Sequence, residues 1–201
     1  YNKLNQISND GYAYDAWGNM IKTPEAEYKY DLKNRLIEVK KKDGIVVKYE
    51  YDPMAQRIAS NVNDKDNTAF LMSSMIEYAR RNSDNPQYHT LGLDLLGTLE
   101  QTGAVGSILA TNNIQYLYDG HGNVIAATLN GVIIDRLAYE PFGKQTLGSN
   151  LPFTFSSKPV DQSEMSYYGY RFYNKTINLW EKKDPIKEIR IEVYQNNINT
   201  Y

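Results

Sequence analysis

The feature that most constrains this chain is a short unit that occurs twice between residues 116 and 143. In each copy an apolar run ends in a tyrosine and an acid, first Tyr118-Asp119 and then Tyr139-Glu140, and a glycine-containing turn follows. Between the copies, Asn130-Gly131 suits the two positive φ angles of a type I′ turn. The flanking runs are rich in residue types that favour strands. Each unit therefore predicts a β-hairpin, and a lone hairpin cannot bury its apolar face.

Three earlier copies of the unit begin at Tyr14, Tyr30 and Tyr51, and the last two are 21 positions apart, the same spacing as in the later pair. The acid after each tyrosine is predicted to accept a hydrogen bond from the backbone two residues on, which closes an Asx-type turn. In the second copy Asn34 replaces glycine at the position that most needs a left-handed conformation. The residues predicted to define the repeat are Tyr14, Asp15, Gly18, Tyr30, Asp31, Tyr51, Asp52, Tyr118, Asp119, Gly122, Tyr139 and Gly143.

The predicted fold class is all-β, built from serial antiparallel β-hairpins. A sandwich or a set of propeller blades fits the number of strands, but it fits a single recurrent unit less well. Asp43-Gly44 predicts a further hairpin turn, and strict alternation would place Leu36 and Val39 on opposite faces of the strand before it. Residues 61–69 are expected to form an irregular solvated loop. The segment Phe70–Arg81 fits a strand or a short helix, and its context favours the strand.

Composition narrows the classes of function. The 201 residues include 18 tyrosines against 5 phenylalanines and 2 tryptophans, so we expect tyrosine rings packed on one face with their hydroxyls near solvent. A net charge of −2 lacks the electrostatic pattern of a nucleic-acid-binding protein, and the absence of cysteine excludes disulfides and thiolate metal sites. No apolar run approaches the roughly 18 residues of a membrane span. Because the sequence begins at Tyr1 without a signal peptide, we expect a fragment or a processed piece.

Several ordered segments resemble a known family. The Tyr-Asp-x-x-Gly units resemble the YD repeats of the Rhs (rearrangement hotspot) family, which the C component of insecticidal Tc toxins and the teneurins share. Residues 88–201 resemble the Rhs-repeat-associated core, and residues 1–87 resemble the hairpins that precede it. The matching segments, in the order typical of the family, are LGLDLLGTLEQTGAVGSILA, YLYDGHGNV, YEPFG, PFTFSSK, SYYGYRFYN and KKDPI.

The resemblance implies a spiral β-shell, or cocoon, that encloses a toxic C-terminal domain while the core segment seals one end. The leading hypothesis is therefore a structural shell segment of a polymorphic toxin. The alternative is an extracellular or cell-surface protein whose YD repeats bind carbohydrate or assemble with one another. Expected partners are the remaining YD repeats of the parent chain, identical chains and an enclosed toxin domain, without nucleic acid or a membrane span. The expected location is secreted or at the cell surface, after delivery by a secretion system.

The resemblance also implies a self-cleaving aspartyl protease in some members, next to a segment resembling RYYDPxTGRWLSRDPIG. Arg171 and Asp184 match this segment and are the candidate catalytic residues, but Asn174 stands where the first aspartate is expected. A mechanism with two carboxylates needs one ionised and one protonated acid, and asparagine cannot titrate. The favoured interpretation is that Asp184 lies in a turn, that Arg171 is its structural ion-pair partner, and that the chain is not an enzyme.

Other chemical candidates are weaker. His89 and His121 stand beside turns without a nearby cluster of acids, so neither metal binding nor general-base catalysis is favoured. Residues 63–67 lack the glycine and the final glutamate of a calcium loop. Residues 40–42 are three lysines that more plausibly protect a strand edge than bind an anion. No cofactor and no metal are expected. Because a stack of hairpins leaves two open edges, we expect the segment to be stable only within a larger assembly.

Overall fold

The computed structural model describes residue 2 and residues 6–82 and 85–184, and over these residues the chain is almost entirely β-structure. Thirteen strands form one sheet in sequence order, and each strand pairs antiparallel with the next. The predicted all-β class of serial hairpins is confirmed. The strands of this sheet are β1 (Ala13–Tyr14), β2 (Met20–Lys22), β3 (Ala26–Tyr30), β4 (Leu36–Lys41), β5 (Val46–Tyr51), β6 (Arg57–Val62), β7 (Asp66–Ser73), β8 (Ile76–Asn82), β9 (Asn85–Leu91), β10 (Ile108–Thr111), β11 (Ile114–Tyr118), β12 (Val124–Leu129) and β13 (Val132–Arg136).

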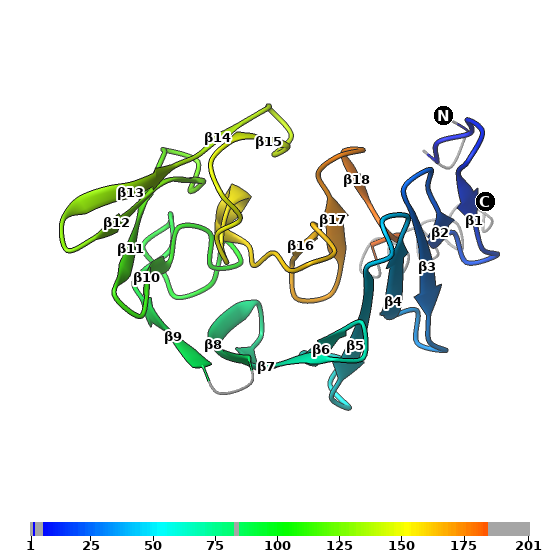
Figure 1. Cartoon of the computed structure of the whole chain (residues 1–201), viewed down its shortest axis with the longest axis horizontal. Coiled ribbons are helices and arrows are strands. Elements are labelled where there is room, and N and C mark those ends of the chain that lie inside the picture. The colour runs from blue at the N-terminus through cyan, green and yellow to red at the C-terminus, as the bar shows by residue number, and fades with distance from the viewer. Residues whose placement is uncertain (1, 3–5, 83–84, 185–201) are drawn as a thin grey trace, which may run out of the picture.

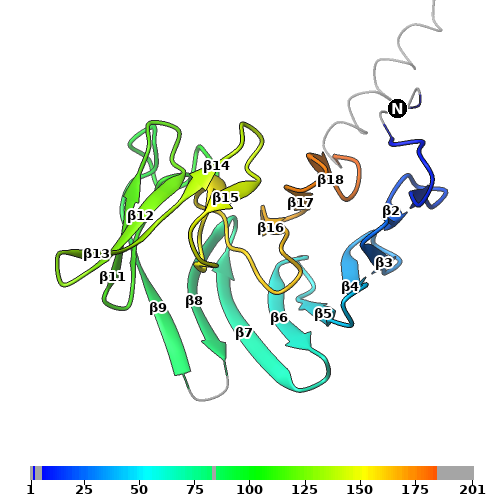
Figure 2. The same cartoon turned by 45° about the horizontal axis from the view of Figure 1, so that its top comes forward.

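The remaining elements are short and follow the sheet in the chain. They are β14 (Ala138–Tyr139), β15 (Gln145–Leu147), the 3-10 helix η1 (Phe155–Ser157), β16 (Ser166–Tyr167), β17 (Phe172–Asn174) and β18 (Leu179–Trp180). The large sheet curves into an arc, and η1 and β16–β18 lie in its hollow in both views (Figure 1 and Figure 2). We call residues 150–184 the inner segment.

The turn of the repeat has the same backbone geometry in every copy. The N–H of the acid donates to the carbonyl four residues on, and the carbonyl of the acid accepts from the N–H three residues on. In the copies at Asp15, Asp31, Asp94 and Asp119 the carboxylate also accepts from the N–H two residues on, as in Asp31 with Lys33 at 2.9 Å and Asp119 with His121 at 2.9 Å. The predicted Asx-type closure is therefore confirmed for these copies, whereas the carboxylate of Asp52 accepts from the N–H of Gln56, four residues on. The acids of the six copies are Asp15, Asp31, Asp52, Asp94, Asp119 and Glu140.

The residue three positions after each acid has a left-handed backbone, which explains the residue types found there. Asn34 has φ 56°, as predicted, and Ala55 adopts φ 66° without being glycine. At Gly122 and Gly143 there is also no space for a side chain. A Cβ at Gly122 would lie 2.5 Å from Val105, and a Cβ at Gly143 would lie 2.5 Å from the ring of Phe155. The copy at Asp94 was missed in the sequence because leucine, not tyrosine, precedes the acid.

A β-bulge follows the turn in each of the five tyrosine-containing copies. In the second copy Tyr30 pairs with Leu36 and Lys29 pairs with Glu38, so Ile37 has no partner across the hairpin. The extra residue puts both Leu36 and Val39 in the core, and strict alternation is therefore wrong for this strand. Bulges increase the local twist of a strand pair. Their recurrence, also in the copies at Tyr14, Tyr51, Tyr118 and Tyr139, accounts for the curvature of the sheet.

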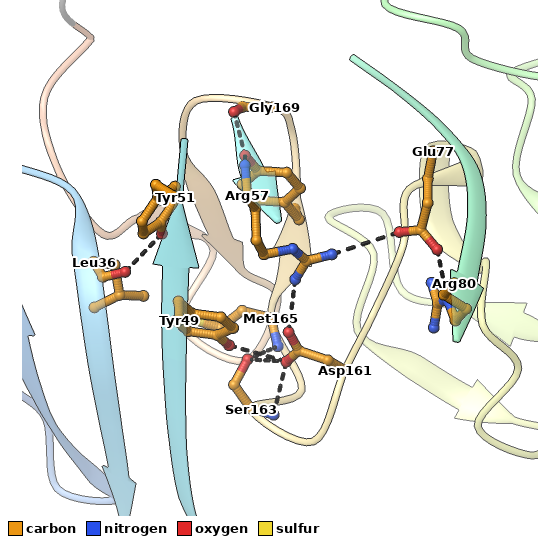
Figure 3. Close-up of polar contacts among 11 residues, drawn as sticks. Leu36, Tyr49, Tyr51, Arg57, Glu77, Arg80, Asp161, Ser163, Met165 and Gly169 are labelled. Atoms are coloured by element: carbon orange, nitrogen blue, oxygen red, sulfur yellow. Dashed lines mark hydrogen bonds and ion pairs between the residues drawn. The ribbon is translucent and has the colours of Figure 1, made fainter. Parts of the chain in front are cut away.

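The tyrosine hydroxyls connect consecutive repeats. Tyr51 donates to the carbonyl of Leu36 at 2.6 Å, and Tyr139 donates to that of Val124 at 2.7 Å (the first bond is drawn in Figure 3). In both cases the acceptor lies six residues after the tyrosine of the previous copy. Burial raises the pKa of Tyr51 well above its usual value. The expectation that these hydroxyls lie near solvent is wrong, because the neighbouring hairpin offers each of them a buried carbonyl.

Two apolar clusters hold the inner segment against the concave face of the sheet. In the first cluster Tyr167 and Phe172 of the inner segment pack on a group from the first five strands that includes Val39 and Val47. In the second, Phe153 packs on residues of β10–β12 that include Tyr116. The inner segment therefore supplies the second layer that a single sheet needs in order to bury its apolar face.

The predicted irregular loop at residues 61–69 is wrong. Strand β6 continues to Val62, Asn63 and Asp64 turn with φ 54° and 56°, and β7 begins at Asp66. Most side chains of the first half of β7 are exposed, so polar residues are tolerated there. The sequence of this half therefore lacks the alternating apolar pattern that would predict a strand. The favoured strand assignment for residues 70–81 is confirmed, although Ser74 divides it into β7 and β8. The expected boundary between residues 87 and 88 falls inside β9, where the sheet continues.

The first prediction concerns the hydroxyl that connects the second and third tyrosine-containing repeats. Tyr51→Phe leaves the carbonyl of Leu36 without this donor but keeps the ring, so we expect a loss of about 1–2 kcal/mol in the free energy of unfolding. Denaturant unfolding of both proteins gives the difference. The matched control is Tyr88→Phe, whose ring is 64% exposed and whose change we expect to stay within about 0.5 kcal/mol. Equal effects in the two variants would refute the role of the hydroxyl.

Candidate functional site

A buried arginine stands at the centre of the contact between sheet and inner segment. Arg57 is the sixth residue after Tyr51, and the equivalent residues of three other copies are the buried apolar residues Met20, Leu36 and Val124. Only 1% of Arg57 is exposed. Burying a charge is costly unless it is paired, so its surroundings must compensate.

Aromatic rings surround the guanidinium of Arg57. Its central carbon lies 4.0 Å from the ring centroid of Phe70 on β7 and 4.3 Å from that of Tyr167 on β16. The rings of Tyr49 and Phe172 lie 5.9 Å and 5.8 Å away. Rings within about 6 Å attract a cation, and a desolvated pair contributes roughly 2 kcal/mol. Two of these rings belong to the sheet and two to the inner segment.

Two carboxylates neutralise Arg57, each at a different nitrogen of its guanidinium (Figure 3). Its Nη1 lies 2.8 Å from Oδ2 of Asp161 in the inner segment, and its Nη2 lies 3.5 Å from Oε2 of Glu77 on β8. The other oxygen of Asp161 accepts hydrogen bonds from the hydroxyls of Ser163 at 2.6 Å and Tyr49 at 3.1 Å. Asp161 is thus held in one orientation by both layers.

Glu77 extends the polar contacts along the sheet. Its Oε1 lies 2.5 Å from Nε of Arg80 and 3.2 Å from Nε2 of His89. Burial by itself would raise the pKa of Glu77, but Arg80, His89 and Arg57 outweigh it and hold the pKa at about 2. Nδ1 of His89 lies 3.0 Å from the hydroxyl of Thr111. The sequence indicated no cluster of acids near His89, and the pairing of β8 with β9 brings one acid, Glu77, beside it.

We call Arg57, Glu77, Arg80, His89 and Asp161 the Arg57 junction. Its two arginines and two carboxylates balance in charge, and the side chains of Arg57, Glu77 and His89 are at most 1% exposed. The side chains of Arg57, Glu77 and His89 are therefore closed to a substrate, whereas Arg80 and Asp161 line a cavity of about 780 Å³. The junction therefore positions the inner segment on the sheet. The one signal of the junction in the sequence is an arginine at a position where other copies of the repeat have an apolar residue.

The two candidate catalytic residues are brought together as an ion pair. Nη2 of Arg171 lies 2.9 Å from Oδ2 of Asp184, and the guanidinium stacks 4.1 Å from the ring centroid of Trp180. Asn174 is not part of this ion pair: its amide donates to the hydroxyl of Tyr28 on β3 at 3.4 Å. This geometry agrees with the structural interpretation of Arg171. A catalytic role of Asp184 stays a prediction, and the rest of the matching segment, from residue 185, lies outside the described residues.

A buried acid in the same region was missed in the sequence. Glu181 is 2% exposed, and its Oε2 accepts a hydrogen bond from the N–H of Phe172 at 2.7 Å. Its Oε1 has no hydrogen-bond partner among the described residues. Burial raises the pKa of Glu181 to about 8, against the opposing charge of Lys182. Burial therefore favours the protonated form of this acid. Its position directly after Trp180 in an aromatic strand is the one signal that could have indicated burial.

The described part of the chain offers no group of three or more acidic or histidine side chains that could hold a metal ion. Within residues 2, 6–82 and 85–184, no helix is long and apolar enough to cross a membrane.

Serial tyrosine–acid hairpins in one curved sheet, with an inner segment packed in its hollow, define a segment of a β-shell. The family model described as teneurin YD-shell matches residues 1–199. The chain therefore belongs to the teneurin YD-shell family, which confirms the YD-repeat resemblance seen in the sequence.

Known proteins with similar sequences are much longer than this chain. It is 26% identical over 182 residues to the tRNA3(Ser)-specific nuclease WapA of Bacillus spizizenii, which covers 87% of this chain and 7% of the relative. It is equally 26% identical over 181 residues to the tRNA nuclease WapA of Bacillus subtilis strain 168, again with 87% and 7% covered. The chain thus spans about one fourteenth of the length of these relatives.

Solved structures share the fold. The crystal structure of TcdB2-TccC3 without its hypervariable C-terminal region superposes with a TM-score of 0.65 at 18% identity, covering 86% of this chain and 10% of that one. The structure of TcdB2-TccC3 itself gives a TM-score of 0.63 at 18% identity with the same coverage. At this level of identity the likeness establishes the arrangement of strands.

The second prediction concerns the Arg57 junction. Arg57→Met introduces the residue that the first repeat has at this position, but it leaves Glu77 and Asp161 buried without their shared partner. Breaking a buried pair in this way costs about 3–5 kcal/mol, which denaturant unfolding measures. The control is Lys29→Met, which removes a pair to Glu38 from a lysine side chain that is 68% exposed, and for which we expect less than about 1 kcal/mol. A stability of Arg57→Met equal to wild type would overturn the assignment.

The third prediction concerns the pH dependence contributed by Glu181. In the unfolded chain its carboxyl ionises near pH 4.5, whereas in the fold it stays protonated up to about pH 8. The contribution of Glu181 to the free energy of unfolding is therefore fully present below pH 4.5 and is lost as the pH rises through about 8. Glu181→Gln removes this penalty, so we expect its stability advantage over wild type to grow between pH 5 and 8, on the order of 3 kcal/mol. Thermal unfolding at several pH values tests this, and a constant difference would contradict it.

Proposed function

We propose that this chain is a wall segment of a YD-repeat toxin, in which the curved sheet encloses a toxic C-terminal domain. The observation that supports this function best is the uninterrupted 13-stranded sheet with its inner segment fastened to the concave face. A curved wall separates an inside from an outside, and the buried pair of Arg57 and Glu77 at the centre of the Arg57 junction is closed to substrates. The proposed role is structural and includes no turnover, and Arg171 and Asp184 serve it as an ion pair.

The relatives support this proposal without supplying an activity. WapA is named as a nuclease and TcdB2-TccC3 has a hypervariable C-terminal region, and both are far longer than this chain. We propose that residues 1–87 are ordinary wall repeats and that residues 88–201 are the core region that follows them. We propose further that the protein acts outside the producing cell, either secreted or at the cell surface.

The edge strand β13 supports a proposal about partners. Val132 and Ile134 on this strand are 65% and 48% exposed, and the far edge of β13 has no strand beside it in the described part of the chain. Open apolar edges favour pairing with further strands. The proposed partners are further YD repeats of the parent chain or an identical chain, together with an enclosed domain. The same edge favours the alternative of a surface protein that assembles with itself.

The fourth prediction tests enclosure in the full-length protein. We expect a protease to cut the domain that follows the shell at least roughly tenfold more slowly in the intact protein than in the same domain produced alone, because cleavage requires the wall to open. Mass spectrometry of timed digests gives both rates. Arg57→Met should increase the rate at which the enclosed domain is cut, while the surface variant Lys29→Met should leave this rate unchanged. Equal rates for the enclosed and the separate domain would refute enclosure and would favour the surface-protein alternative.

A further inference from the structure

A cavity of about 780 Å³ lies between the concave face of the sheet and the inner segment. Side chains of β6 to β9, including Thr68 and Gln87, lie on one side of it, and side chains of the inner segment, including Thr154 and Lys175, lie on the other. The volume is within the roughly 300–1,000 Å³ of ligand sites. A side chain and the short segment that carries it can therefore enter, whereas a folded domain cannot.

Lys175 is a buried cation in the wall of this cavity. Only 9% of the residue is exposed, and its ammonium donates to the hydroxyl of Thr154 over 3.4 Å. Both residues line the cavity, so the ammonium lies at its wall. An ammonium has three N–H donors, and this one long hydrogen bond leaves donors for a ligand. Burial lowers the pKa of Lys175 to about 8, so most molecules still carry the charge at neutral pH.

The acids nearest in effect to Lys175 already have partners. Asp161 and Glu164 are the two carboxylates whose charges act on it. Asp161 lies 2.8 Å from Arg57. Glu164 lies 2.9 Å from Lys41, which also lines the cavity. A buried cation is costly unless it is paired, and in the described part of the chain Lys175 forms no ion pair within 4 Å.

The remaining charges of the cavity wall do not compensate Lys175 either. Arg80 and Lys144 each pair with a glutamate, at 2.5 Å and 3.4 Å. Asp66 is exposed at the start of β7, and its charge is not one of those that act on Lys175. Lys175 is therefore the one buried cation of this wall without an ion-pair partner among the described residues. The cavity favours an anionic group beside it.

Side-chain amides and hydroxyls line the same cavity. The side chains of Thr68 and Gln87 on the sheet and of Gln162 on the inner segment make no hydrogen bond to the described residues. The backbone of β7 to β9 is paired with neighbouring strands, so this face of the sheet offers side chains and not backbone groups to a ligand. A side-chain amide donates and accepts as a peptide group does. These residues can therefore bind the peptide groups on either side of an acidic residue.

We propose that this cavity receives the carboxylate of an aspartate or glutamate on an extended segment of the enclosed domain. The ammonium of Lys175 pairs with the carboxylate, and Gln87 and Gln162 donate and accept hydrogen bonds with the adjoining peptide groups. The cavity is on the concave side of the sheet, which faces the enclosed domain in the proposed function. The source of the segment rests on that proposed function, whereas the chemistry of the site does not.

The fifth prediction is tested by titrating the full chain with the peptide acetyl-Gly-Glu-Gly-amide and with the same peptide containing glutamine. The two peptides have the same shape and differ in charge, so at about pH 6.5 we expect the glutamate peptide to bind at least tenfold more tightly. At about pH 9.5 Lys175 has lost its charge, and this preference should disappear. Calorimetry measures the four dissociation constants.

Three variants separate the charge from the rest of the site. Lys175→Met keeps the apolar stem and removes a buried charge that has no ion-pair partner, so we expect it to fold and to bind both peptides equally. Lys175→Arg keeps the charge and should retain the preference. Gln87→Leu should weaken both peptides by a similar factor of about three to ten, because it removes a hydrogen bond that they share. The matched control outside the cavity is Lys29→Met, which should change neither affinity.

Propionate, the glutamate side chain without its peptide groups, tests whether a chain segment is the ligand. We expect it to bind at least tenfold more weakly than the glutamate peptide. Propionate binding as tight as the peptide, no preference for glutamate over glutamine at about pH 6.5, or an undiminished preference in Lys175→Met would each overturn the proposal.

In the full-length protein a carbodiimide, which joins an amine and a carboxylate in contact, should link Lys175 to an acid of the domain that follows the shell. Mass spectrometry of the digested product identifies the linked pair. Protection of that domain from protease without this link would overturn the site and leave the enclosure standing. A retained preference for the glutamate peptide without protease protection would refute the enclosure, and with it the source of the segment, so the two failures differ.

Discussion

The hydrogen bond from a repeat tyrosine to a carbonyl of the preceding repeat, made by Tyr30, Tyr51 and Tyr139, is the interaction on which the wall depends. A β-bulge disturbs the ladder after every tyrosine-containing turn, and the carbonyl next to it needs another donor. The next tyrosine supplies that donor, as Tyr51 does for Leu36. One side chain thus satisfies a buried backbone group and sets the distance between two hairpins. The bulge bends the sheet, and the tyrosine holds the bend.

A curved sheet must also cover its concave face, and here the chain uses a polar junction as well as an apolar core. Arg57 occupies a position where other repeats have Met or Leu, and its counter-charge Asp161 lies about a hundred residues later in the chain. Buried ion pairs are weak sources of stability, but an unpaired charge is strongly unfavourable. The junction therefore makes one placement of the inner segment far better than any shifted placement. Wall and inner segment form one unit for this reason.

The end of the inner segment contains two acids in different surroundings. Asp184 forms an ion pair with Arg171, while Glu181, three residues earlier, is buried, and burial raises its pKa. A nearby cation favours the charged form of a carboxyl, whereas burial disfavours it. Position in the fold therefore decides how each of the two acids can be used.

The sequence by itself determined the all-β class, the hairpin turns and the positions where a left-handed backbone is required. Those features depend on contacts within a few residues, as Asn34, Asp43-Gly44 and Asn130-Gly131 illustrate. It also determined the family, because the order of the repeat and core segments is visible without coordinates. Polar residues hid part of β7, since an exposed strand needs no apolar pattern. Only the tertiary structure decided the buried hydroxyls, the bulges and the partners of Arg57 and Glu181. Those depend on which distant segments the curved sheet brings together, and burial then sets the charge of each group.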